Sequence, residues 1–321
     1  MNNSNSIHIN ILKQFYRFVF VISFLGLFLF VFDYGYNQSS DVQIFLNASY
    51  FLIIVLGILS SVLRYRLKEK IIKRNVLVFD ITSILISFIV LYIHFFSEEA
   101  HRHLTFLYND NWVKFAIILT FIREFSEQNI NFKRAVLNPA QLFIVSFLVI
   151  IFIGSLLLML PNATHQGLSF IDALFTSTSA VCVTGLIVVD TGSYFTVFGQ
   201  AIILMLIQIG GLGILTFASY FSYFFKGGST YENQLTLSDV TGSNKLGEVF
   251  STLKRILVIT FSIELVAALL IYLSIKGTLF KTLGDQLFFS VFHSISAFCN
   301  AGFSTLPNNL FESGFKYNYF L

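Results

Sequence analysis

The chain has 321 residues, of which 55% are hydrophobic, 17% aromatic and only 12% charged, and its mean hydropathy is +0.77. Soluble domains carry about 25% charged residues, so this composition excludes an ordinary water-soluble protein. The net charge of +3 is small, and the two cysteines have no metal-like spacing, so neither a disulfide framework nor a zinc site is indicated.

Seven apolar segments are candidates for membrane-spanning helices, because about 20 apolar residues are needed to cross the hydrocarbon core. They cover residues 14–33, 44–63, 76–96, 112–128, 140–160, 195–225 and 256–275. The fourth is the weakest candidate, because it is short and holds Lys114, Arg123 and Glu124. Two further apolar stretches, 170–181 and 286–298, are too short to span and are expected to be re-entrant or buried helices.

The distribution of Lys and Arg predicts that the N-terminus is cytoplasmic. With that orientation, 15 of the 20 Lys and Arg residues fall on the inner side, as the positive-inside rule requires. Both short apolar stretches then enter from the outer face. The basic run 64–74 suits either a nucleic-acid patch or a cytoplasmic loop near anionic lipid, and the membrane context favours the loop.

A repeat is visible in the second half of the chain. Residues 175–186 and 292–303 align without gaps at an offset of 117 residues, with six of twelve positions identical. The identical pairs are Phe175/Phe292, Ser177/Ser294, Ser179/Ser296, Ala180/Ala297, Cys182/Cys299 and Gly185/Gly302. The repeated unit is larger than this motif: a span, a short helix, a turn with glycine, and a second span.

The properties of a membrane limit what such a unit can do. Non-helical backbone survives at membrane depth only where it is buried or lines a wet cavity. There its carbonyl oxygens can replace the water shell of a cation, and the preceding helix points its partly negative C-terminal end toward that cation. Glycine permits a positive φ and a close approach to the backbone. The repeat therefore predicts an ion filter, with serines that hydrogen-bond the loop behind it. These serines are Ser177, Ser179, Ser294 and Ser296.

At this point the chain resembles the bacterial potassium-uptake family that includes TrkH and KtrB. Three motifs are similar to that family's first pore repeat: SAVCVTGL at 179–186, VVDT at 188–191 and LIQIGGLG at 206–213. Residues 292–306 are similar to its second repeat, and the likeness covers about 138–321. The family folds four such repeats of one chain around a single pore, with one filter glycine in each.

The resemblance assigns ion-facing carbonyls to six residues and implies potassium as the transported ion, with no other cofactor. The six residues are Val183, Thr184, Gly185, Asn300, Ala301 and Gly302. In related plant transporters, serine at the first filter glycine accompanies sodium selectivity, and here both visible positions are glycine. Cys182 and Cys299 are expected to pack behind the filter as small hydrophobic side chains, with a redox pair as the alternative.

Four further residues lie inside predicted spans. Gly210, Gly211 and Gly213 suit close helix packing, and they also suit a bend or gating point that lines the inner pore. Glu264 is an isolated carboxylate in the seventh span, and such groups mark function or form a structural hydrogen bond.

The complete prediction is an all-α integral membrane protein with an incomplete pseudo-fourfold pore. A four-span bundle (1–130) precedes the first repeat (138–225), a cytoplasmic loop (226–255) and a second repeat (256–321) truncated before its closing span, which should begin around Tyr317. Two repeats are half of the family's filter, so we expect these 321 residues by themselves not to conduct selectively. The alternative is a non-conducting fragment or membrane scaffold.

The N-terminal bundle suits either docking and assembly or a voltage sensor. One arginine, Arg123, with Glu124 beside it in the sequence, is too little charge for steep gating. A membrane enzyme finds no support, since the six histidines, His101 and His103 included, form no ligand pattern. The resemblance also implies a bacterial inner membrane, a homodimer, and a cytoplasmic nucleotide-binding ring subunit on loop 226–255, with no nucleic-acid partner.

Overall fold

The computed structural model describes residues 2–67, 74–96, 110–126, 139–226, 245–275, 280 and 282–307. These residues form helices and no strand, apart from one isolated β-bridge between Thr164 and Phe195. Five of the helices are long and apolar enough to cross a membrane, which confirms the prediction of an all-α integral membrane protein. The five spans are Leu12–Gly35, Ser40–Tyr65, Val76–Phe95, Val197–Thr216 and Leu253–Ile275.

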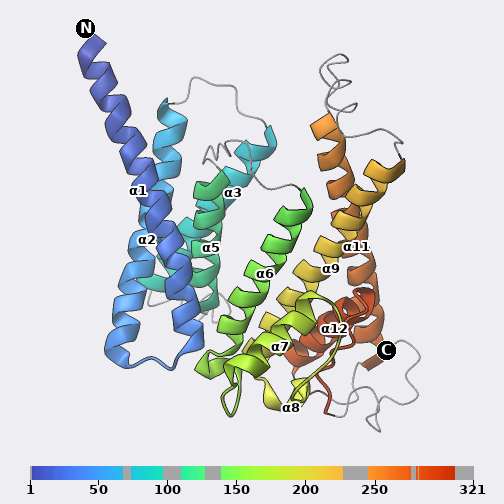
Figure 1. The fold of residues 1–321 in the computed structure, drawn as a ribbon. Coiled ribbons are helices and arrows are strands. Elements are labelled where there is room, and N and C mark those ends of the chain that lie inside the picture. The colour runs from blue at the N-terminus through green and yellow to red at the C-terminus, as the bar shows by residue number, and fades with distance from the viewer. Residues whose placement is uncertain are drawn as a thin grey trace. The chain divides into compact units, whose positions relative to one another are not determined.

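The chain divides into two compact units, Met1–Arg134 and Ala135–Leu321. The first unit is a bundle of four helices that pack on one another (Figure 1). These are α1 (Asn2–Gly35), α2 (Ser40–Leu67), α3 (Arg74–Leu91), which a π-helical turn at Tyr92–Phe96 extends, and α5 (Asp110–Ser126). Helix α5 has 17 residues, which is short for a span, so the expected fourth span is present as a helix but is not among the five. The expected fifth span, 140–160, corresponds to helix α6 (Pro139–Leu158), whose apolar stretch Phe143–Leu158 is also too short to be among the five.

Buried ion pairs connect the helices of this bundle. Arg123 of α5 places its Nε 2.6 Å from Oδ1 of Asp80 in α3, and Arg64 of α2 pairs with Glu124 of α5. All four side chains are at most 7% exposed. Arg123 and Glu124 are neighbours in the sequence but pair with different helices, because adjacent residues of a helix point in different directions.

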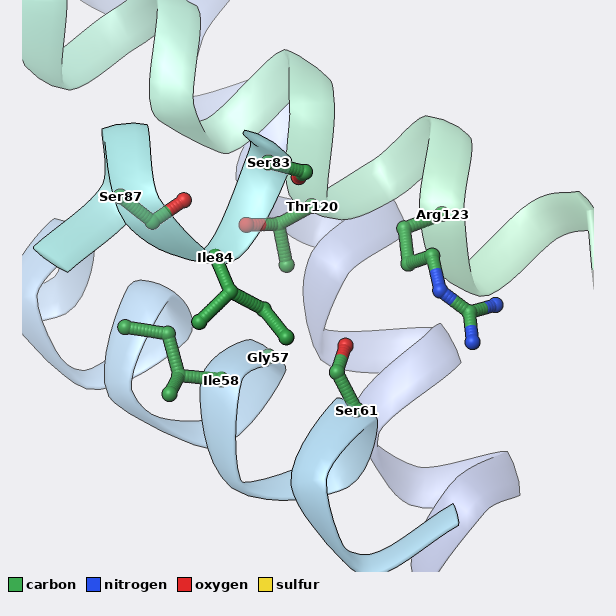
Figure 2. Close-up of a pocket in the computed structure, with 8 residues that line it drawn as sticks. All are labelled: Gly57, Ile58, Ser61, Ser83, Ile84, Ser87, Thr120 and Arg123. Carbon is green, nitrogen blue, oxygen red and sulfur yellow. The ribbon is translucent and has the colours of Figure 1, made fainter. Parts of the chain in front are cut away.

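A small polar pocket lies among α2, α3 and α5 (Figure 2). Its lining residues are Gly57, Ile58, Ser61, Ser83, Ile84, Ser87, Thr120 and Arg123. Figure 2 shows the serine and threonine hydroxyls on three different helices, with the Arg123 guanidinium at one end of the group. Since Arg123 is paired with Asp80, the pocket offers hydroxyl groups rather than an uncompensated charge.

The second unit consists of long helices around two short ones. The long helices are α6 (Pro139–Leu158), α9 (Val197–Lys226) and α11 (Lys245–Ile275). The short helices α7 (Phe170–Val181) and α12 (Leu283–Phe298) lie toward the same end of this unit (Figure 1). A 3₁₀ turn at Pro161–Ala163 and the single turn α8 (Thr191–Tyr194) connect them. Helix α7 packs on α6 and α9, and α12 packs on α11 and α9.

The predicted ends of the helices can be compared with the observed ones. Helix α7 has the expected bounds, and α12 begins slightly earlier than expected, at Leu283. Helix α11 begins at Lys245, so the end of the predicted cytoplasmic loop is helical. Other predictions lie outside the described residues: most of the basic run, His101 and His103, loop residues 227–244, and the closing span near Tyr317.

Candidate functional site

The two short helices begin with the same cap. Ser169 Oγ accepts a hydrogen bond from the backbone N–H of Asp172 at 3.2 Å and donates to its carboxylate at 2.7 Å. Thr282 and Asp285 make the same two bonds, at 3.1 Å and 2.7 Å. A cap of this kind satisfies backbone donors that a helix otherwise leaves open, and it fixes where each short helix starts.

The two helices also end alike. Val183 and Asn300 follow their last turns in the left-handed conformation, with φ of 57° and 56°. In the first repeat, the N–H of Thr184 donates to the carbonyl of Ser179 at 2.9 Å, and the second repeat makes the equivalent bond at 2.7 Å. This pattern is a Schellman motif, which stops a helix and turns the chain away from its axis.

The chain that leaves each motif reaches its counterpart from the other repeat. Gly185 and Gly302 both have positive φ, 74° and 70°. A Cβ added to Gly185 would overlap the carbonyl oxygen of Ala301, and one added to Gly302 would lie 3.9 Å from Gly185 Cα. The two segments that the sequence repeat aligned, 117 residues apart, are therefore in contact.

The carbonyl oxygens of these segments are not used by the fold. No described residue donates a hydrogen bond to the carbonyls of the six predicted filter residues. These are Val183, Thr184, Gly185, Asn300, Ala301 and Gly302. The C-terminal ends of α7 and α12, which carry partial negative charge, lead directly into these segments. Such a group of open carbonyls can take the place of water around a cation.

Two of the four predicted serines anchor the short helices to the long ones. Ser177 Oγ donates to the carbonyl of Ile151 in α6 at 2.8 Å, and Ser294 Oγ donates to that of Glu264 in α11 at 2.6 Å. The partners lie 26 and 30 residues earlier in the chain. The second separation is longer because α12, with 16 residues, has one helical turn more than α7, with 12.

The other two serines hold the chain beyond the helix. Ser179 Oγ lies 3.1 Å from the Thr184 hydroxyl, and Ser296 Oγ donates to the carbonyl of Phe303 at 2.7 Å. Each bond joins the last turn of a short helix to the segment that follows it. All four serines were expected to hold the loop, but in each repeat one serine supports the loop and the other fixes the short helix to a long one.

The two cysteines differ in environment. Both are free, but Cys182 is exposed and Cys299 is partly buried. A Cβ on Gly211 of α9 would lie 2.5 Å from Cys299 Sγ, so α9 of the first repeat covers the thiol of the second. No described residue covers Cys182 in the same way. The prediction that both cysteines pack as small hydrophobic side chains is therefore wrong for Cys182.

Close packing accounts for the three glycines of α9, which runs without interruption through them. A Cβ on Gly210 would overlap the carbonyl oxygen of Val181 at the end of α7, and one on Gly213 would lie 2.9 Å from the ring of Phe147. The bend or gating role stays a prediction.

Sequence reasoning missed two buried side chains near this site. Gln200 of α9 donates from Nε2 to the carbonyls of Thr191 and Phe195, at 3.1 and 3.2 Å. His293 of α12 contacts Ser304 Oγ through Nε2 and the Phe289 carbonyl through Nδ1, both at 2.9 Å. A carbonyl only accepts, so Nδ1 carries the proton there. A polar residue within an apolar helical run is the signal that could have identified both.

Glu264 is 5% exposed and has a partner on another helix. Its Oε1 accepts a hydrogen bond from Gln208 Nε2 of α9 at 3.0 Å. A structural hydrogen bond, one of the two explanations open from the sequence, is therefore present.

The architecture defines an all-α membrane protein in which two short capped helices end in facing segments of open carbonyls. The family model of TrkH, described as cation transport protein, matches residues 109–321, and the chain belongs to this family. This membership removes the membrane-enzyme alternative.

Curated relatives agree with this assignment. The chain is 46% identical over 173 residues to the Ktr system potassium uptake protein B of Bacillus subtilis (strain 168), covering 54% of this chain and 38% of that protein. It is 36% identical over 170 residues to the protein of the same name from Vibrio alginolyticus, covering 53% and 37%. It is also 36% identical over 176 residues to the potassium/sodium uptake protein NtpJ of Enterococcus hirae, covering 54% and 39%. The chain thus spans about two fifths of the length of these relatives.

Proposed function

We propose that the protein transports potassium into the cell, and that its second unit supplies two quarters of the ion filter. The carbonyl oxygens of residues 183–185 and 300–302 would surround the dehydrated ion, which is cargo and not a resident cofactor. One observation carries this proposal: two segments built alike, each at the C-terminal end of a capped short helix, meet at Gly185 and Ala301.

The glycine at both filter positions supports potassium over sodium. The names of the relatives include potassium uptake in two cases and potassium/sodium uptake in the third, so sodium is the competing ion that a test must include. The alternative, a non-conducting fragment or scaffold, has its own support in the exposed thiol of Cys182 and the exposed Thr184.

The membrane location, the orientation and the partner proteins are further parts of this proposal. We propose a bacterial inner membrane with the N-terminus in the cytoplasm, because Lys and Arg gather on that side. A cytoplasmic nucleotide-binding ring subunit would contact the basic loop 226–255, and the full-length protein would be a homodimer. The N-terminal unit would serve docking or assembly, since its buried arginines are neutralised by Asp80 and Glu124.

The test is potassium uptake by the full-length protein in a bacterial strain that lacks its own uptake systems. We expect growth at low external potassium and uptake that excess sodium does not suppress. Cells with an empty vector provide the control. If the protein reaches the membrane and neither growth nor uptake rises above this control, the proposed function is wrong.

A further inference from the structure

The segment of α9 around Gln208 contacts both α11 and the end of α12, the helix that leads into the second filter segment. Gln208 Nε2 donates to Glu264 of α11 at 3.0 Å, and Gly211, three residues later, lies against Cys299 at the end of α12. Ser294 of α12 donates to the backbone carbonyl of Glu264 at 2.6 Å. One residue, Glu264, is thus bound to α9 by its side chain and to α12 by its backbone.

The carboxylate distinguishes the two repeats. The equivalent serine of the first repeat, Ser177, donates to the carbonyl of Ile151, whose side chain is apolar. The second repeat has Glu264 in that place, and its side chain is 5% exposed. An ionisable group inside a membrane costs free energy and is a candidate functional group by default. The hydrogen bond from Ser294 is accepted by the backbone carbonyl of residue 264, so that bond does not require a carboxylate side chain.

Glu264 also lies near the end of α12. The Cys299 thiol follows this short helix as its C-cap and is outside the five spanning helices. Burial first, and the Glu264 carboxylate second, raise the pKa of that thiol to about 11. The hydrogen bonds from Gln208 and Ser294 hold Glu264 between α9 and the second half of α12, and a nearby cation would favour the ionised form of its carboxylate.

We propose that Glu264 is a positioning residue for the second filter segment, whose carboxylate, held by Gln208, stands behind that segment as a counter-charge for the ion. This inference rests on the proposed function. Charge interactions are strong in surroundings of low dielectric constant, so the group would favour a dehydrated cation at that quarter of the filter. Because the first repeat has no such group, the filter would be electrostatically asymmetric.

The experiment compares potassium and sodium uptake by the purified full-length protein in lipid vesicles. Glu264→Gln keeps the size and an acceptor oxygen but removes the charge, and we expect the potassium-to-sodium ratio to fall about tenfold, the factor of one interaction of ordinary strength. Gln208→Leu leaves the carboxylate without its donor, and a similar fall is expected. The exchange Gln208→Glu with Glu264→Gln restores an amide–carboxylate pair and should recover most of the ratio.

Ser262→Ala provides the control, because Ser262 is exposed on the same helix. Among the described residues its hydroxyl bonds only the Val258 carbonyl of its own turn, at 2.6 Å. The potassium-to-sodium uptake ratio of Ser262→Ala should equal that of the wild-type protein. An unchanged ratio in Glu264→Gln, or no recovery in the exchanged pair, overturns the inference, and Gln208→Leu decides alone if Glu264→Gln does not fold. Absence of uptake by the wild-type protein instead contradicts the proposed function.

Discussion

Val183 occupies the left-handed position after α7, where a helix-ending motif most often has glycine. A β-branched residue with φ of 57° is a rare conformation, and it costs on the order of 1–3 kcal/mol. Asn300, in the equivalent place, tolerates this conformation better. Such strain concentrates at ligand sites, and no propensity rule would assign it to valine. The sequence repeat located the segment, but its backbone conformation had to come from the structure.

Gly185→Ala and Gly302→Ala should reduce potassium uptake to different extents, although both add one methyl group at positive φ. The new Cβ at 185 would overlap the Ala301 carbonyl oxygen, while the one at 302 meets only Gly185 Cα at 3.9 Å. We expect Gly185→Ala to abolish potassium uptake by the full-length protein and Gly302→Ala to reduce it less. Uptake rates at equal amounts of protein in the membrane measure the difference. A more severe effect at 302 would contradict the contact between the two segments.

The helices were more predictable than the side-chain partners. The bounds of α7 follow from an apolar run of 12 residues that opens after Ser169, whereas α12 gains its first residues because Thr282 caps it. The partner of Arg123 could not be read from the chain, because Asp80 lies on a helix distant in sequence. Periodicity and length determine where a helix forms, but the pairing of buried charges depends on how helices pack.

Gly210→Ala and Gly213→Ala test whether α9 is fixed by backbone contact. At 210 the added Cβ would overlap the Val181 carbonyl oxygen, which is part of rigid backbone, while at 213 it meets the Phe147 ring at 2.9 Å, and a side chain can move. We expect Gly210→Ala to lower the free energy of unfolding by about 1–3 kcal/mol, as at other overpacked sites, and Gly213→Ala to lower it less. Thermal unfolding in detergent measures both. Equal losses would argue against rigid contact between α9 and α7.

The ion pair of Arg123 and Asp80 should be essential to the N-terminal bundle. Arg123→Gln leaves the Asp80 carboxylate, 1% exposed, without its cation, and breaking a buried pair costs about 3–5 kcal/mol. Adding Asp80→Asn removes the charge left behind, so we expect the double variant to be more stable than Arg123→Gln alone. Thr82→Ala, at an exposed position of α3, should change stability by less than about 0.5 kcal/mol. A double variant no more stable than the single one would contradict the pairing.

At the scale of the whole molecule, the two repeats are alike in backbone and unlike in surroundings. Their caps, left-handed residues and positive-φ glycines match almost one for one. Yet Cys299 is covered by α9 of the first repeat while Cys182 is exposed. Helix α12 of the second repeat therefore relies on α9 of the first repeat, whereas α7 packs on α6 and α9 of its own repeat. Alignment of the repeats reveals the likeness, but only the packing reveals this dependence.

The crossing of α5 and α6 decides the topology of the entire chain. Helix α5 is short and carries charged residues, and the positive-inside rule predicts that it crosses nonetheless. We place single cysteines at Asn37, Ser126 and Gln166, all exposed, in protein whose native cysteines are replaced by alanine, and treat cells with a thiol reagent that does not cross membranes. If α2, α3, α5 and α6 all cross, Asn37→Cys and Gln166→Cys react in intact cells, and Ser126→Cys reacts only after permeabilisation. Reaction of Ser126→Cys together with Asn37→Cys would mean that α5 does not cross. Reaction of Ser126→Cys alone would mean that the N-terminus is outside, against the positive-inside rule.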